Sequence, residues 1–178
     1  MFLSGQALES GLVQAYLPVK TLIYALGYTS GVWVTLLAIF KLKRAGIEGD
    51  SAQVSVGSCL ILFLIGAALV TLPQMIDAGS MTAFGTVAPD QSSLAYTPTT
   101  SNPLLIKATA FIHALSYFFN MVGMFAVLRA FYIWHECTLG YRNSTFWKAM
   151  FHFLGGVVAV NNRQVAEMIA SLLSGFNG

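Results

Sequence analysis

The run FLIGAALV at Phe63–Val70 recurs as FLGGVVAV at Phe153–Val160, an offset of 90 residues in a chain of 178. Gln74 is followed by Gln164 at the same offset. A duplicated unit of two membrane helices produces an offset of half the chain length. Chance alignment of low-complexity apolar sequence is the alternative explanation.

A second match lies ahead of each run. ALGY at Ala25–Tyr28 recurs as ALSY at Ala114–Tyr117, with an offset of 89 residues. Each half of the chain therefore holds two apolar segments in the same order. This order favours two tandem helical hairpins of the same sense, which is a parallel repeat rather than an inverted one.

The composition indicates an integral membrane protein. The hydrophobic fraction is 56% and the charged fraction 9%, against about 25% charged residues in an ordinary soluble domain. The mean hydropathy is +0.70. The net charge of +2 is too small to indicate a nucleic-acid-binding protein. The length leaves room for about four membrane spans joined by short loops, and none for a separate catalytic domain.

The expected fold is all-α, with four transmembrane helices arranged as two tandem hairpins. The order is an interfacial segment at 1–20, a first hairpin at 21–72, a loop at 73–103 and a second hairpin at 104–178. Pro73 is expected to stop the second span. The fourth span, from Phe146, is expected to run on as continuous helix past Asn161.

The distribution of basic residues predicts the orientation. Six of them flank the two hairpin links: Lys41, Lys43, Arg44, Arg129, Arg142 and Lys148. Lys20, Lys107 and Arg163 lie at the opposite ends of the spans, where the segment 73–103 contains neither Lys nor Arg. Because Lys and Arg are enriched in cytoplasmic links, both links are expected in the cytoplasm. The interfacial segment, the 73–103 loop and both termini then face the periplasm.

Small residues recur in three of the expected spans. Gly27 and Gly31 share a face of the first span, Gly66 lies in the second, and Gly155 and Gly156 lie in the fourth. Burying Leu gains nothing over lipid, so membrane helices associate through small residues that let their backbones approach closely. These five glycines are therefore the expected helix-packing residues. Ordinary glycine abundance in membrane spans is the alternative.

The remaining polar residues of the spans predict no catalytic or metal site. His113, His152 and Asn161 are expected to be hydrogen-bonded packing residues, and Arg163 should pair with Glu167 one turn later. No cluster has the spacing of four zinc ligands, and no nucleophile or paired carboxylates have a catalytic arrangement. We therefore expect no enzyme and no cofactor, with phospholipid as the one candidate ligand.

Three motifs resemble a known family. They are FLIGAALVTLP at Phe63–Pro73 followed by Asp77 and Gly79, GMFAVLRA at Gly123–Ala130, and STFWKAMFHFLGGVVAVN at Ser144–Asn161. Their order and spacing resemble the IcmC/DotE membrane proteins of Dot/Icm-type type IVB secretion systems and TraQ of I-type conjugative plasmids. The N-terminal segment and Asn162-Arg163 depart from that pattern.

The resemblance implies a structural component of a secretion or conjugative DNA transfer apparatus in the bacterial inner membrane. Its expected partners are lipid, further copies of itself and other subunits, with transferred DNA or protein reached only indirectly. Each hairpin also resembles a short pilin, so a tandem pilin that polymerises with phospholipid into an extracellular pilus is an alternative. In that case the basic links would line the filament lumen rather than only set topology. A small channel or carrier is a further alternative.

Overall fold

The computed structural model describes residues 5–48, 56–89, 103–140 and 145–175, and within these ranges its regular structure is entirely α-helical. The elements in chain order are α1 (Gly5–Glu48), α2 (Val56–Val70), α3 (Leu72–Phe84), α5 (Pro103–Thr138), α6 (Phe146–Val160) and α7 (Asn162–Gly175).

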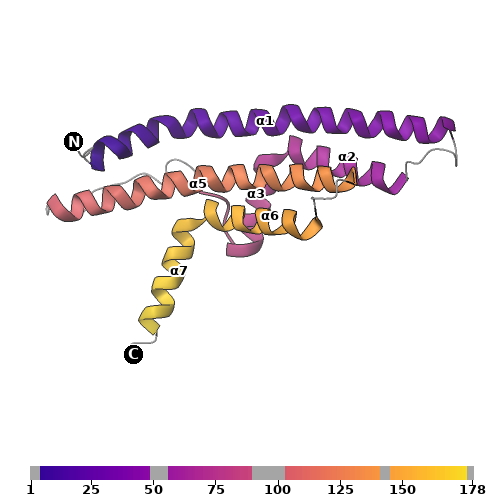
Figure 1. Cartoon of the computed structure of the whole chain (residues 1–178). Helices are drawn as coiled ribbons and strands as arrows, with labels where there is room; N and C mark the ends of the chain where they lie inside the picture. The colour runs from indigo at the N-terminus through magenta and orange to yellow at the C-terminus, as the bar shows by residue number, and fades with distance from the viewer. Residues whose placement is uncertain (1–4, 49–55, 90–102, 141–144, 176–178) are drawn as a thin grey trace.

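The helices form two hairpins of the same sense. The long helices α1 and α5 run side by side in one direction, and α2 and α6 return antiparallel to them (Figure 1). Both hairpin links therefore lie at the same end of the bundle. At the other end of α2 and α6 the chain bends, and α3 and α7 follow (Figure 1).

The first helix is longer than the sequence analysis predicted. The expected interfacial segment at 1–20 and the first span from residue 21 belong, over the described residues, to the single helix α1. Pro18 lies inside this helix, where it removes one backbone hydrogen bond without ending the element. The side chain of Tyr16 is fully buried and hydrogen-bonded to α5, so this part of the chain is packed into the bundle.

The second helix ends where the sequence analysis placed a stop, but helix rather than loop follows it. α2 ends at Val70, and α3 leaves at 90° after Thr71. Pro73 explains the break, because it has no N–H to donate to Leu69 and its ring clashes with that carbonyl. The expectation of a loop from residue 73 was therefore wrong for 73–84. Residues 90–102 of that expected loop lie outside the described residues.

The expectation of a continuous fourth span was also wrong, because α6 ends at Val160 and α7 begins at Asn162. The residue between them, Asn161, is fully buried. Its side-chain amide donates to the carbonyl of Val157 at 2.8 Å and to the hydroxyl of Ser80 at 2.7 Å. An Asn side chain that bonds to nearby backbone in this way competes with the helical ladder, which explains a break without proline.

The second helices of the two hairpins match each other at an offset of 90 residues. Each has 15 residues, and the breaks fall at Thr71 and Asn161. Their backbone angles agree, with φ −99° and ψ 32° at Thr71 and φ −98° and ψ 28° at Asn161. The two second helices are therefore alike in length, in where they end and in the backbone angles of the break, and they lie at the same offset of 90 residues as FLIGAALV and FLGGVVAV.

Each hairpin is closed by a pair of facing glycines. A Cβ atom built on Gly31 would lie 2.7 Å from the carbonyl oxygen of Gly66 and 2.6 Å from the nitrogen of Val70. In the second hairpin, a Cβ on Gly123 would lie 2.7 Å from the carbonyl oxygen of Gly156. These distances leave no room for any side chain. The backbones of α1 and α2, and of α5 and α6, are therefore in direct contact.

Two described helices are long and apolar enough to cross a membrane, namely the segments Gln14–Ile47 and Ala108–Thr138. The bent pair α2 and α3 makes a third if it is counted as one span, whereas α6 is apolar but shorter. Large apolar side chains cover much of the outside, including Trp33, Phe40 and Phe151. Such an exterior is suited to lipid, where apolar side chains need no cover from protein.

We predict that Gly31→Leu and Gly156→Leu each destabilise the chain by about 1–3 kcal/mol, because the new side chain would collide with backbone of the facing helix. Thermal unfolding in detergent would measure the change. Gly155→Leu is the matched control, since a Cβ at Gly155 has no described atom within 4 Å. Equal destabilisation by all three substitutions would show that the glycine contacts do not hold the hairpins.

Candidate functional site

A chain of buried hydrogen bonds joins α1, α5 and α6 where α6 ends. The hydroxyl of Tyr16 donates to Oδ1 of Asn120 at 3.0 Å. Nδ2 of Asn120 donates to the carbonyl of Val160 at 2.9 Å. Val160 is the last residue of α6, where carbonyls lose their helical partners. Asn120 of α5 therefore provides a hydrogen-bond partner for the last carbonyl of α6 and at the same time binds α1 through Tyr16.

A second set of bonds joins α3 to the same point. Asn161 donates to Ser80 on α3, and Ser80 donates in turn to the carbonyl of Ile76 at 2.9 Å. We call Tyr16, Ser80, Asn120 and Asn161 the polar belt. All four side chains are at most 1% exposed. Buried polar groups need such partners, most of all in an apolar surrounding, so the belt fixes how the helices meet at the breaks.

A cavity of ≈ 320 Å³ lies beside the belt and carries the charged groups of this region. Lys20 of α1 and Asp77 of α3 line it, together with Tyr16 and Tyr24. Nζ of Lys20 lies 5.6 Å from the ring centre of Tyr16 and 5.8 Å from that of Tyr24. Oδ1 of Asp77 accepts from the backbone N–H of Ala88 at 3.3 Å.

This combination suits a polar head group better than a chemical step. The ammonium of Lys20 can meet a phosphate, the phenol of Tyr24 can donate to it, and Asp77 can face a cationic group. Cations held over aromatic faces are a common feature of such sites. The cavity is therefore where phospholipid, the one ligand expected from the sequence, has suitable chemistry. Lys20, Tyr24 and Asp77 were not among the predicted site residues, and only their contact across helices distant in sequence reveals them.

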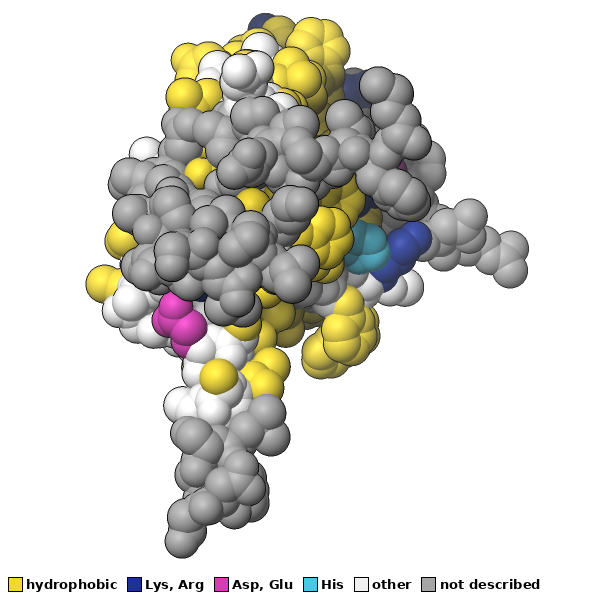
Figure 2. Space-filling view, turned by 90° about the vertical axis from the view of Figure 1, so that its left-hand side faces the viewer, with side chains coloured by type: hydrophobic (Ala, Val, Ile, Leu, Met, Phe, Trp, Pro, Cys, Tyr) yellow, Lys and Arg dark blue, Asp and Glu magenta, His cyan; other side chains and the backbone are white. Residues whose placement is uncertain are grey.

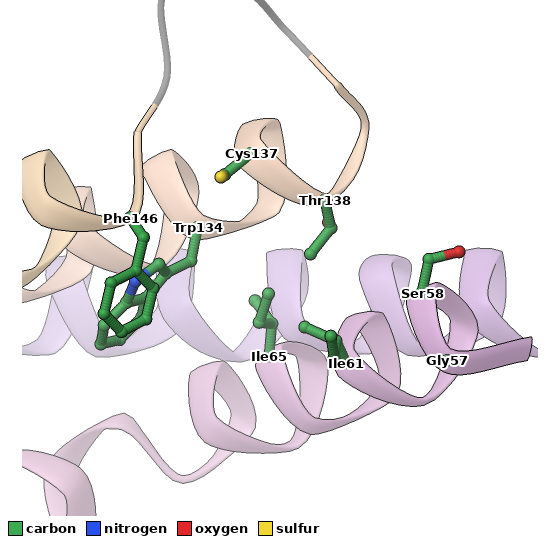
Figure 3. Close-up of a pocket in the computed structure, with 8 residues that line it drawn as sticks. All are labelled: Gly57, Ser58, Ile61, Ile65, Trp134, Cys137, Thr138 and Phe146. Atoms are coloured by element: carbon green, nitrogen blue, oxygen red, sulfur yellow. The ribbon is translucent and has the colours of Figure 1, made fainter. Parts of the chain in front are cut away.

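A larger cleft of ≈ 710 Å³ opens between the hairpins near their links. Ile61 and Ile65 project from α2 toward α5, and Trp134 and Phe146 close one end with ring centres 6.0 Å apart (Figure 3). Cys137 and Thr138 complete the α5 side. The lining is mostly apolar. The cleft can accommodate an acyl chain or an apolar side chain of a neighbour, and it offers little to a polar substrate.

The described basic residues of the links lie together at one end of the bundle (Figure 1). Lys41, Lys43 and Arg44 are near the end of α1, and Lys148 is in the first turn of α6. Lys43, Arg44 and Lys148 are exposed, whereas Lys41 is half-buried. Arg142 lies outside the described residues. The end of α1 and the start of α6 thus lie toward the same end of the bundle, as a parallel repeat requires, and α1 extends beyond α5 and α6 there (Figure 1).

The predicted polar residues of the spans lie at separate places. Nε of Arg163 is 3.2 Å from Oε1 of Glu167, which is the pair expected from their spacing, and both side chains are exposed. Nδ1 of His152 is 2.8 Å from the carbonyl of Lys148 on its own helix. His113 is half-buried in the first half of α5. Among these residues only Asn161 belongs to the polar belt.

The predicted packing glycines are mostly at helix crossings. Gly31, Gly66 and Gly156 form the contacts described above, and a Cβ on Gly27 would lie 2.8 Å from Cδ2 of Leu72. Gly155 lies at no helix crossing of the single chain, because no described atom lies within 4 Å of its Cβ position. Gly123 was missed. Aligning the first helices at an offset of 92 rather than 89 would have paired it with Gly31.

No family model, curated protein or solved structure matches this chain. Among the described residues, no group of three or more His, Cys, Asp or Glu side chains could hold a metal ion.

We predict that Asn120→Leu costs more stability than Tyr16→Phe. The first removes both bonds of Asn120 and leaves the buried Val160 carbonyl without the Asn120 amide, which costs about 1–3 kcal/mol, whereas the second removes only the bond to Tyr16 and leaves Asn120 bound to Val160. Because the substitutions share a bond, the double variant should cost less than the sum of the two. Unfolding in detergent would measure this cycle, and strict additivity would show that the belt is not coupled.

Proposed function

We propose that this protein is a non-enzymatic structural subunit of a type IVB secretion or conjugative transfer apparatus in the bacterial inner membrane. The repeated hairpin is the observation that carries the structural part of the proposal. Two units with the same glycine crossing and the same helix break form a modular scaffold with an apolar exterior. Such a scaffold suits assembly in a membrane.

The choice of apparatus rests on the resemblance to IcmC/DotE and TraQ proteins. The motif STFWKAMFHFLGGVVAVN begins just before the N-cap of α6 and ends at the Asn161 break. It contains Gly156 and Val157, which contact α5 and α3 respectively. The motif GMFAVLRA begins at Gly123, which faces Gly156. The resembling residues therefore include both sides of one glycine crossing, which supports a shared packing scheme.

We further propose that all four helices α1, α2, α5 and α6 cross the membrane, with both links in the cytoplasm. A helix of 15 residues spans ~22 Å, less than the ~30 Å of a typical hydrocarbon core. Local thinning of the bilayer and the snorkelling of Lys148 accommodate this difference. The polar belt and Lys20 then lie at the periplasmic level of the membrane.

The tandem pilin remains a second candidate, because the two hairpins repeat one pilin-sized unit within a single chain. The two candidates differ in where the protein is found. A fixed subunit stays in the inner membrane, whereas a filament subunit is also recovered in sheared extracellular fractions.

We predict that deletion of the gene abolishes transfer of DNA or effector protein, and that the intact chain restores it. Gly156→Leu should fail to restore transfer, whereas Tyr16→Phe, which keeps the bond from Asn120 to Val160, should restore most of it. Transfer counts and cell fractionation of a tagged chain would be measured together. Normal transfer in the deletion strain would reject the proposed function. Tagged chain in sheared filaments would favour the pilin.

We predict that a cysteine at Val87 is labelled from the periplasm and one at Gly46 from the cytoplasm. Both positions are exposed. Gly46 is in the last turn of α1, whereas Val87 lines the cavity with Tyr16 and Lys20, near the other end of that helix. A chain with Cys59→Ala and Cys137→Ala supplies the background, and a membrane-impermeant maleimide is the reagent. Labelling of Val87→Cys only after the cells are opened would reverse the proposed orientation.

A further inference from the structure

The helix α7 leaves the bundle with its apolar face uncovered. Met168, Ile169 and Leu172 are 50%, 52% and 59% exposed, and they follow the spacing of one helical face. Figure 1 shows α7 directed away from the other helices, and Figure 2 shows it as an arm carrying hydrophobic side chains below the body. Such an apolar face is available either to lipid or to the surface of another protein chain.

The first unit of the repeat shows how the equivalent helix is covered. α3 follows α2 as α7 follows α6, and α3 lies against the second hairpin. A Cβ atom on Gly79 of α3 would be 2.8 Å from Cγ2 of Val157 and 3.4 Å from Phe153, both on α6. Ser80 accepts from Asn161 at the same contact. The first unit thus places its bent helix on the second helix of the next unit.

We propose that α7 docks on α2 of a second copy of this chain, in the way that α3 docks on α6 within one chain. The offset of 90 residues between the two units predicts which residues meet in this contact between copies. Gly79 corresponds to Ile169 on α7, and Val157 corresponds to Ala67 on α2. Ile169 and Ala67 are both exposed in the single chain, whereas Val157 is 2% exposed under α3.

The sizes of the corresponding side chains are complementary. Within the chain a residue without a side chain on α3 meets a β-branched residue on α6. Between copies a β-branched residue on α7, Ile169, meets a small one on α2, Ala67. The bulk moves from one partner to the other, and the two side chains together carry five carbon atoms instead of three, so the helices of two copies are expected to lie slightly farther apart than α3 and α6.

The acceptor surface on α2 is also apolar and uncovered. Leu60, Phe63 and Leu64 are 55%, 45% and 66% exposed, and Ala67 continues this face. Phe153, which corresponds to Phe63, is packed beside Gly79 in the intrachain contact. The surface that α3 uses on α6 therefore has a counterpart of the same kind on α2, available to another chain.

The contact joins two different surfaces, so it is heterologous: the α7 end of one copy binds the α2 side of the next. Such contacts build rings when the rotation closes and open chains when it does not. Since α3 runs at 90° to α2, the equivalent direction of α7 places successive copies side by side in the membrane plane. The proposed contact does not depend on the transfer function.

Disulfide cross-linking of the full chain in native membrane vesicles tests the contact. In the Cys59→Ala, Cys137→Ala background, Ile169→Cys on one tagged chain is co-expressed with Ala67→Cys on another. Oxidation is expected to give a mixed dimer, and a chain with both substitutions is expected to give a ladder of oligomers. Thr86→Cys with Gln164→Cys, placed on a separate chain, should cross-link within that chain and reports correct folding, because the two side chains are hydrogen-bonded and lie outside the polar belt.

Glu167→Cys, on the opposite face of α7, is the matched control and should not cross-link to Ala67→Cys. Dimers formed by Ile169→Cys with itself would indicate a symmetric contact and overturn the proposal. Absence of any cross-link between chains, with the intrachain pair formed, would assign the α7 face to lipid and also overturn it. Either result, with transfer intact, leaves the proposed function standing.

Discussion

The direct contact between glycine backbones across each hairpin is the constraint on which the rest of the structure depends. Lipid tails are as apolar as a leucine side chain, so apolar burial alone does not hold two membrane helices together. Close backbone approach replaces it, through many short van der Waals contacts. Gly31 against Gly66, and Gly123 against Gly156, bring the helices to the separation at which the neighbouring side chains interlock. The outward faces then remain available for lipid or for another chain.

The glycine crossings also determine where the polar groups can be. With α2 and α6 held against α1 and α5, the ends of the two short helices reach the level of Tyr16 and Asn120. Asn120 can then donate to the end of α6 and accept from α1 at the same time. A separation of α5 and α6 larger by the width of one methyl group would break the bond from Asn120 to Val160. The polar belt is thus a consequence of the crossings, and it converts two hairpins into one unit.

The sequence predicted the second helices better than the first ones. FLIGAALV and FLGGVVAV carry glycines at the crossings, so their match reproduces the structural offset, although the break at Asn161 was not predicted. The ALGY and ALSY match is three residues out of register, because α1 and α5 expose different faces and their common feature is a single glycine. Gly155 and Gly156 are indistinguishable by composition, and only the facing helix decides which of them is at the crossing. The cavity at Lys20 and Asp77 required contacts between distant helices.

The two breaks have the same geometry but different causes, and this difference couples the halves of the chain. The first break needs only Pro73, whose ring excludes a continuous helix whatever surrounds it. The second has no proline, and it relies on Asn161, whose amide is bonded to Ser80 of the first unit. Docking of α3 on α6 therefore helps to set the direction of α7. The bend of the first unit is set by its own proline, whereas the bend of the second unit depends on a hydrogen bond to the first. The contact between α3 and α6 therefore transmits the bend from one repeat to the next.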